Sequence, residues 1–304
     1  MIDESLLRTE ALAHLAVRKA AGVEWFTREE TFSLGELTIR YMSPQTGIWK
    51  PAGWEGALSI STVYSLPGRS RPYDDELFGS DGPAIYKWRG TDPMQSDNRA
   101  LRHCMNNQLP MIWFEGYAPG HYSASFPIYL IKEEPDQHQF VVALENENHW
   151  SSLDLSQPDS DIEVEYALRQ TKQRLHQSRF RAAVMDAYSC RCAVCRFGHS
   201  QLLDAAHIIP DSQSGLASVT NGMALCRIHH AAYDNNIIGI RPDLVIEVNQ
   251  NVLDEKDGPM LLHGIQEFND HRLMVIPGRR ALRPNPDFLQ RRYEEFLDKS
   301  TFIG

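Results

Sequence analysis

Apolar positions recur along the chain with two different periods, and the period predicts where helices and strands lie. Within residues 1–24, the apolar side chains Leu7, Ala11 and Leu15 follow the three-to-four-residue spacing of one helix face. Polar residues such as Arg8, Thr9 and Glu10 stand between them. We therefore expect one amphipathic N-terminal helix over residues 3–21.

From residue 25 to residue 150 the dominant period changes to two. Short alternating runs are separated by proline and glycine, as is typical of strands joined by turns. The runs most typical of strands are 37–41, 58–64, 84–88, 111–114, 126–131 and 140–144. Residues 97–107 are the one stretch of this region with helical spacing. The pattern predicts a mainly β, barrel-like domain with a small helical insertion.

Residues 151–163 are acidic, polar and free of aromatic side chains, which is typical of a linker. The elements expected after it are a helix over 165–187, a Cys/His-rich core over 190–235, short strands around 237–248 and a last helix with Asn285 as its cap and Pro286 in its first turn. These elements predict a second domain over 164–304, and the whole chain is predicted to be an α+β protein.

Length and composition agree with two globular domains. The chain has 304 residues, of which 42% are hydrophobic and 23% charged, so collagen, coiled coil and intrinsic disorder are excluded. No apolar run approaches the ~20 residues that a bilayer-spanning helix needs. The first residues also lack the basic and apolar segments of a secretory signal. We therefore expect a cytoplasmic protein without a membrane anchor.

Charge separates the two halves of the chain. The net charge of −10 argues against a protein that coats nucleic acid without selectivity. Residues 1–163 hold 13 basic and 24 acidic residues, a net charge of −11, whereas residues 164–304 are at +1. The near-neutral second half also contains a basic run between residues 169 and 181.

Four of the five cysteines fall within 37 positions, which favours metal binding over a disulfide framework. Cys192 and Cys195 form one pair with a two-residue spacing, and Cys226 and His229 form a second. Two such pairs complete a closed tetrahedral site, which predicts a structural Zn²⁺ ion. Unconnected buried cysteines are the alternative, and Cys190 is a possible substitute ligand.

A second set of polar residues lies between these pairs: Asp204, His207, Asn221, His230 and Asp234. His230 and Asp234 are four residues apart on an expected helix, so one face can hold a cation. His207 ends a short apolar strand, where its imidazole can deprotonate a water molecule. Phosphodiester hydrolysis needs such a base together with a hard cation.

Residues 188–235 resemble the HNH nuclease module, a ββα-metal fold with a zinc-binding knuckle. The three residues that name the module match in order as His207, Asn221 and His230. The resemblance implies that His207 is the general base and that His230 binds Mg²⁺ or Mn²⁺. It also implies that Asn221 holds the loop and orients the His207 ring.

The chain departs from this family at Ala206, where many members carry an acidic or histidine ligand directly before the base. The missing ligand of the catalytic ion is then expected from Asp204, Asp234 or water. Two alternatives remain open at this point. His207 can be an ordinary buried histidine, and the whole module can be a zinc-containing DNA-binding protein without catalytic activity.

Basic side chains near the module are candidates for contacts with DNA phosphates. Those in the helical stretch before it are Arg169, Lys172, Arg174, Arg179 and Arg181, and those after it are Arg279, Arg280 and Arg283. Of these, Arg174, Arg179 and Arg181 are the leading candidates. The alternative is that each run is simply a solvated face of a helix or loop.

The β-rich region 25–150 is expected to decide where the nuclease cuts. It is rich in aromatic residues, which can stack on a base flipped out of the duplex. The base-reading candidates are Tyr86, Trp88, Arg89 and Asp92. Packing within the core is the alternative for each of these aromatic rings.

The order of a β-barrel-like domain followed by an HNH module resembles modification-dependent restriction endonucleases with an SRA/PUA-like reader. The resemblance implies cleavage of double-stranded DNA that carries modified cytosine, for example methylated or hydroxymethylated. Because one site per chain must cut two strands, a homodimer is expected, with the N-terminal helix as a candidate interface. The alternative is an unselective nuclease controlled by a ligand of the first domain.

Overall fold

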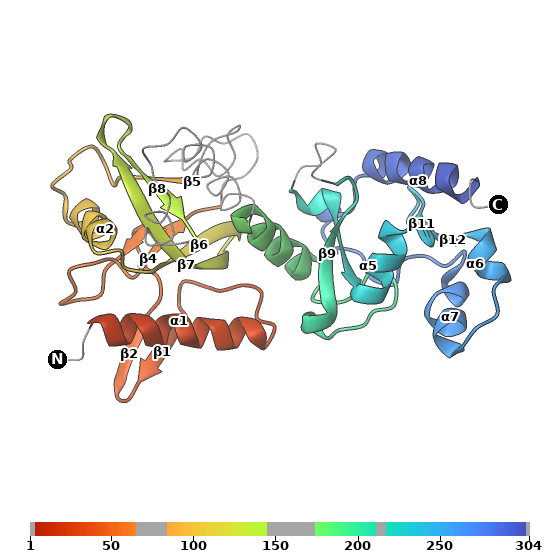
Figure 1. Cartoon of the computed structure of the whole chain (residues 1–304), viewed down its shortest axis with the longest axis horizontal. Coiled ribbons are helices and arrows are strands. Elements are labelled where there is room, and N and C mark those ends of the chain that lie inside the picture. The colour runs from red at the N-terminus through yellow and green to blue at the C-terminus, as the bar shows by residue number, and fades with distance from the viewer. Residues whose placement is uncertain (1–3, 65–83, 145–173, 211–216, 302–304) are drawn as a thin grey trace, which may run out of the picture. The chain divides into compact units, whose positions relative to one another are not determined.

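The computed structural model describes residues 4–64, 84–144, 174–210 and 217–301 (Figure 1). The chain divides into two compact units, residues 1–179 and 180–304. The division falls within a helix over residues 174–187. The expected linker 151–163 and the first part of the helix expected over 165–187 lie outside the described residues.

The N-terminal unit begins with the predicted helix, α1 (Glu4–Ala20). Leu7, Ala11 and Leu15 on its apolar face are buried in one cluster with Phe114 of the sheet. The helix lies beside a hairpin formed by two short strands (Figure 1). The apolar face of this helix, a candidate dimer interface, is therefore covered within the same unit.

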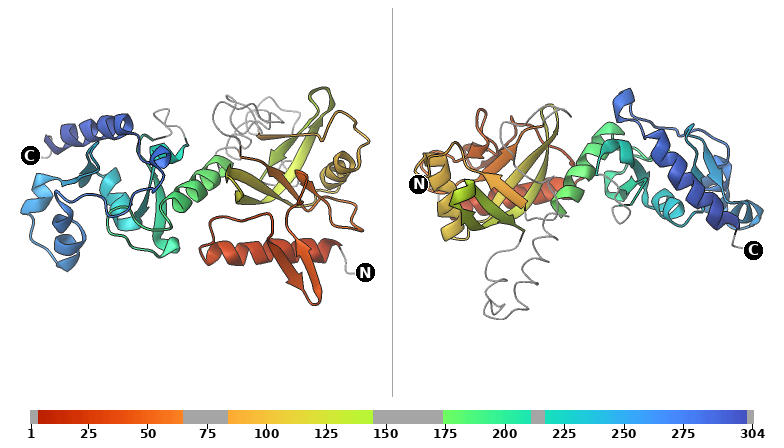
Figure 2. Two further views of the ribbon diagram at one scale, coloured as in Figure 1. Left: turned by 180° about the vertical axis from the view of Figure 1, so that it is seen from behind. Right: turned by 90° about the horizontal axis from the view of Figure 1, so that it is seen from above.

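A curled, half-barrel sheet forms the centre of this unit (Figures 1 and 2). Its strands, in spatial order, are β3 (Ile48–Trp49), β4 (Ser59–Thr62), β6 (Met111–Ala118), β7 (His121–Glu134), β8 (Gln139–Ala143) and β5 (Ala84–Lys87). The pair β4–β6 is parallel and the other pairs are antiparallel. A separate hairpin consists of β1 (Thr31–Leu34) and β2 (Leu37–Arg40). The β-rich character is confirmed, but the described strands form an open half-barrel and not a closed barrel.

The two faces of the sheet bury different clusters because side chains alternate along each strand. On β6, Ile112 and Phe114 join the cluster under α1, whereas Met111 and Trp113 join a second cluster. This second cluster is covered by α2 (Ser96–Asn106), the predicted helical insertion. The sheet is thus buried on both faces, which explains why several of its strands are almost wholly apolar.

The C-terminal unit combines short strands with helices (Figures 1 and 2). Its strands are β9 (Leu203–His207), β10 (Gly222–Cys226), β11 (Ile238–Ile240) and β12 (Ile246–Val248), and its labelled helices are α5 (Arg227–Asp234), α6 (Gln250–Asp254), α7 (Pro259–Gly264) and α8 (Pro286–Thr301). The side chain of Asn285 accepts a hydrogen bond from the amide of Asp287 at 2.9 Å, as expected for the cap of α8.

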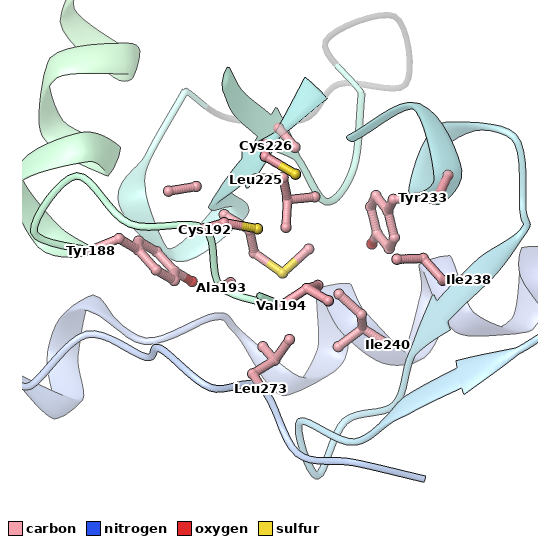
Figure 3. Packing of buried hydrophobic residues seen from close by; sticks show 14 of the residues in the cluster. Tyr188, Cys192, Ala193, Val194, Leu225, Cys226, Tyr233, Ile238, Ile240 and Leu273 are labelled. Carbon is pink, nitrogen blue, oxygen red and sulfur yellow. The ribbon is translucent and has the colours of Figure 1, made fainter. Parts of the chain in front are cut away.

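Strands β9 and β10 pair antiparallel, and α5 begins directly after β10. This is the ββα order that the resemblance implied. The core beneath it includes Cys192 and Cys226 beside Val194 and Leu225 (Figure 3). No helix in the described part of the chain is long and apolar enough to cross a membrane.

Candidate functional site

The four predicted zinc ligands lie together in the C-terminal unit. The Sγ atoms of Cys192, Cys195 and Cys226 and a ring nitrogen of His229 all lie within 4.8 Å of one another. The Nδ1 atom of His229 is 3.6 Å from Cys192 Sγ and 3.1 Å from Cys226 Sγ. A tetrahedral Zn²⁺ ion places its sulfur and nitrogen ligands about 3.6–3.8 Å apart. These residues can therefore hold a metal ion, and three sulfurs with one imidazole nitrogen are ligand types that zinc accepts.

The chemistry of the cluster also fits a soft cation. Hydrogen bonds from the thiols of Cys192 and Cys195 lower the pKa of the Cys226 thiol, so a thiolate is favoured there. The other ring nitrogen of His229, Nε2, lies 2.9 Å from the carbonyl oxygen of Gly264. Donation to this carbonyl fixes the tautomer that leaves Nδ1 unprotonated for a metal. No pattern in the sequence around Gly264 could have predicted this contact, because a backbone carbonyl is present at every residue.

The strand pair β9–β10 joins this cluster to the candidate base. The register places Leu203 opposite Cys226 at one end and His207 opposite Gly222 at the other. The metal cluster therefore fixes one end of the pair, and the candidate base stands at the opposite end. His207 is half-buried, and its imidazole stacks on the ring of Phe180 with centroids 4.0 Å apart.

Asn221 lies fully buried in the short 3₁₀ turn η4 (Val219–Asn221), directly before β10. Its Nδ2 atom donates to the carbonyl of Ile209 at 2.9 Å, and its Oδ1 atom accepts from the amide of Ile209 at 2.9 Å. The Asn221 side chain thus ties down both polar atoms of the peptide backbone two residues beyond His207. This geometry agrees with the expected loop-holding role.

Replacing Asn221 with alanine is expected to destabilise the C-terminal unit by about 2–4 kcal/mol, because the buried N–H and C=O of Ile209 lose their partners. Cleavage is expected to slow as well, since the loop after His207 loosens. Urea unfolding followed by circular dichroism measures the first effect. Asn235→Ala is the matched control, because Asn235 is exposed and its side chain donates only to the Ala231 carbonyl. Equal unfolding midpoints for the two variants would contradict the expectation.

The three candidates for the catalytic ion are neighbours but do not converge on one point. His230 Nδ1 lies 3.4 Å from a carboxylate oxygen of Asp204, and His230 Nε2 lies 3.4 Å from one of Asp234. The carboxylates therefore approach different nitrogens of one ring. Within the described residues, only the Cys/His cluster brings three or more ligand atoms within 4.8 Å of one another. A single cation can thus take His230 with either carboxylate, but not all three as they stand.

Asp204 lies close to Ala206, the position at which the chain departs from the family. Residues two apart on a strand share a face, so Asp204 lies on the face of β9 to which Ala206 belongs. The adjacent histidines of α5 have different surroundings: His229 is buried in the Cys/His cluster, whereas the side chain of His230 is 28% exposed.

Arg181 contacts the beginning of β9 and the acidic residue of this site. Its guanidinium donates to the carbonyls of Leu203 at 2.7 Å and Ser200 at 3.2 Å, and it lies 3.6 Å from a carboxylate oxygen of Asp204. These contacts hold the beginning of β9 and its acidic residue. Arg181 thus has a structural role within the unit, and its contact with DNA phosphates stays a prediction.

The other basic candidates occupy more open positions. Arg174 is exposed, Arg179 is half-buried, and Arg279 and Arg280 are exposed. Arg283 donates to the carbonyl of Pro277 at 3.1 Å. Arg169 and Lys172 lie outside the described residues.

Two of the base-reading candidates belong to the core of the N-terminal unit. Tyr86 and Trp88 are each 4% exposed. The ring of Tyr86 meets Trp113 edge to face at 5.9 Å, and Trp88 packs against Phe140 at 6.4 Å. These rings could stack on a flipped base only by leaving the core, so their contacts favour the packing alternative.

The other two candidates hold the loop before α2. Arg89 pairs with Asp97 at 2.7 Å. The Asp92 side chain accepts from the amide of Met94 at 2.8 Å, and its carbonyl accepts from the side chain of Asn98 at 2.8 Å. Through these contacts, Arg89 and Asp92 stabilise the loop before α2.

Comparison with known proteins identifies the class of the C-terminal unit. Residues 192–241 match the HNH_2 family, described as HNH endonuclease. The matched segment contains the four zinc-type ligands together with His207, Asn221 and His230. The chain thus carries an HNH endonuclease domain, and it is a nuclease.

Two solved structures are similar to larger parts of the chain. One is a "Modification dependent TagI restriction endonuclease", with 18% identity, a TM-score of 0.32, and coverage of 83% of this chain and 85% of that one. The other is the type IV phosphorothioation-dependent restriction endonuclease ScoMcrA, with 11% identity, a TM-score of 0.25, and coverage of 85% of this chain but 53% of that one. Both TM-scores are below 0.5, so neither likeness determines the fold or the specificity of this chain. No curated protein matches the sequence.

Proposed function

We propose that this protein is a metal-dependent restriction endonuclease that cleaves double-stranded DNA carrying modified cytosine. In this proposal the C-terminal unit performs hydrolysis, the N-terminal half-barrel unit selects the modified site, and two copies cut the two strands. The single observation that carries the hydrolytic part is the β9–β10 pair, which holds His207 at the end opposite Cys226. The proposal that the N-terminal unit selects the modified site is supported by the presence of this separate unit, which has core clusters of its own.

His207 is the proposed general base, which takes a proton from the attacking water. Asn221 secures the loop that follows His207 through the Ile209 backbone. His230, with Asp204 or Asp234, is proposed to hold Mg²⁺ or Mn²⁺, which would polarise the phosphate and stabilise the leaving oxygen. The Cys192, Cys195, Cys226 and His229 cluster is proposed to bind Zn²⁺ in a structural role, because four protein ligands leave no open position.

The charges of the N-terminal region bear on how selection can work. Residues 1–163 carry a net charge of −11, which disfavours strong attraction to phosphates along the duplex. Selection through a local contact with one base is compatible with this charge, because such contacts need few basic residues. Arg174 and Arg179 remain proposed phosphate contacts.

Three duplexes of one sequence test the proposal: one with ordinary cytosine, one with 5-methylcytosine or 5-hydroxymethylcytosine, and one with phosphorothioate linkages. With Mg²⁺ or Mn²⁺, we expect the cytosine-modified duplex to be cut at least about 10-fold faster than the others, the discrimination that one well-made base contact provides. EDTA is expected to stop cleavage. Equal cutting of all three would indicate an unselective nuclease, and faster cutting of the phosphorothioate duplex would assign a different modification.

A further inference from the structure

The closest aromatic contact among the described residues lies on the candidate base. The ring of Phe180 and the imidazole of His207 have centroids 4.0 Å apart and planes inclined by only 13°. The next closest ring pair in the described part of the chain, Phe32 with Tyr41, is separated by 5.0 Å. Phe180 is 3% exposed and belongs to the core of the C-terminal unit. One face of the imidazole is therefore covered by a fixed aromatic ring.

Gly222 provides the space for this ring. It stands opposite His207 in the β9–β10 register. Its backbone has φ −134° and ψ 152°, ordinary extended values that any residue can adopt. A Cβ atom built at Gly222 would lie 2.7 Å from Cζ of Phe180 and 2.6 Å from Cγ2 of Val184. Glycine is thus required here by the neighbouring side chains and not by its own backbone conformation.

We propose that Phe180 is a positioning residue for His207 and that Gly222 is kept free of a side chain so that the two rings can stack. The proposal rests on the proposed function, in which His207 is the general base. A base must present its nitrogen within about 2.6–3.2 Å of the water that it deprotonates. Contact between two flat rings restricts rotation of the imidazole and so keeps that nitrogen aimed at the water.

The stack also acts on the charge that develops during the reaction. When His207 accepts a proton, its ring becomes cationic, and an aromatic face attracts a cation. The attraction is absent from the neutral ring before proton transfer. Phe180 therefore favours the step in which the base is protonated, which is expected to affect turnover more than DNA binding.

Phe180→Leu tests the proposal, because leucine fills part of the volume without a flat face. With the 5-methylcytosine duplex and Mn²⁺, we expect kcat to fall about 10-fold while KM changes less than about twofold, a loss typical of a misplaced catalytic group. Gly222→Ala is the second variant, since it retains Phe180 but displaces its ring. Met185→Leu is the matched control, because Met185 is fully buried in the same helix and core. Thermal unfolding and zinc content are measured for all variants.

The outcomes separate this proposal from the proposed function. If Phe180→Leu and Gly222→Ala keep the kcat of Met185→Leu while His207→Ala is inactive, the positioning role is wrong and the base assignment stands. If His207→Ala cuts as fast as the unmodified enzyme, the proposed base itself is wrong. A fall in kcat that occurs only together with unfolding at the assay temperature would also overturn the positioning role.

Discussion

Replacing His207 with alanine is expected to reduce the rate of DNA cleavage by about 10²–10⁴-fold, the contribution that a positioned general base makes. The same variant should bind DNA with unchanged affinity and should remain folded at the assay temperature. The reason is that β9 is held by backbone pairing with β10 and by the core side chains Leu203 and Ala206, none of which depends on the imidazole. Single-turnover cleavage, fluorescence anisotropy with labelled duplex and circular dichroism measure the three quantities.

His263→Ala is the matched control for this experiment. His263 lies on α7, its side chain is 61% exposed, and it pairs with Glu267 at 2.8 Å on the same surface. It shares the chemistry of His207 but belongs neither to the Cys/His cluster nor to the candidate catalytic and ion-binding residues. The control should cut at the unaltered rate. Retained cutting by the His207 variant would remove the proposed base.

Sequence periodicity predicted most elements of the fold because it reports which side of an element is buried. The helical spacing of Leu7, Ala11 and Leu15 predicted α1, and the structure buries all three residues. The alternating runs likewise predicted β4 to β8. Periodicity does not report which strands are neighbours, since that depends on contacts between distant segments. The parallel pairing of β4 with β6 was therefore not predicted.

The candidate site was predictable where ligand chemistry constrains spacing. Two cysteines separated by two residues, followed by a similar Cys–His pair, have few other structural explanations, and the structure brings their ligand atoms together. The contacts of Arg181 and Phe180 were not predictable. The sequence shows that an arginine or a phenylalanine lies on a helix, but it does not show which element the side chain faces. Both residues meet β9 through the folding of the unit.

The role of an aromatic residue in a strand is hard to predict from sequence for the same reason. Tyr86 lies on β5, and Trp88 follows directly after this strand. Their rings suit base stacking as well as core packing. Sequence shows that such a ring is present but not which of the two sheet faces it joins or what covers that face. In the structure, α2 covers the face to which both rings belong.

Removing the metal from the Cys/His cluster is expected to unfold the C-terminal unit while the N-terminal unit remains folded. A structural zinc site of this kind contributes about 10–16 kcal/mol of binding free energy to folding, which is comparable to the whole stability of a small domain. Two of its ligands, Cys192 and Cys226, lie within the core itself, beside Val194 and Leu225 (Figure 3). Cys195→Ser should lose the bound metal, because a closed tetrahedral site needs all four ligands.

Metal content, thermal unfolding and limited proteolysis test this expectation on the full chain. Protease should digest residues 180–304 of Cys195→Ser and leave a fragment that ends near residue 179, since the first unit has its own two cores. Cys190→Ser is the matched control: it removes a nearby cysteine that does not belong to the four-residue cluster, so metal and stability should be retained. Full stability of Cys195→Ser without bound metal would contradict a structural ion, because the fold of the C-terminal unit would then not depend on the metal.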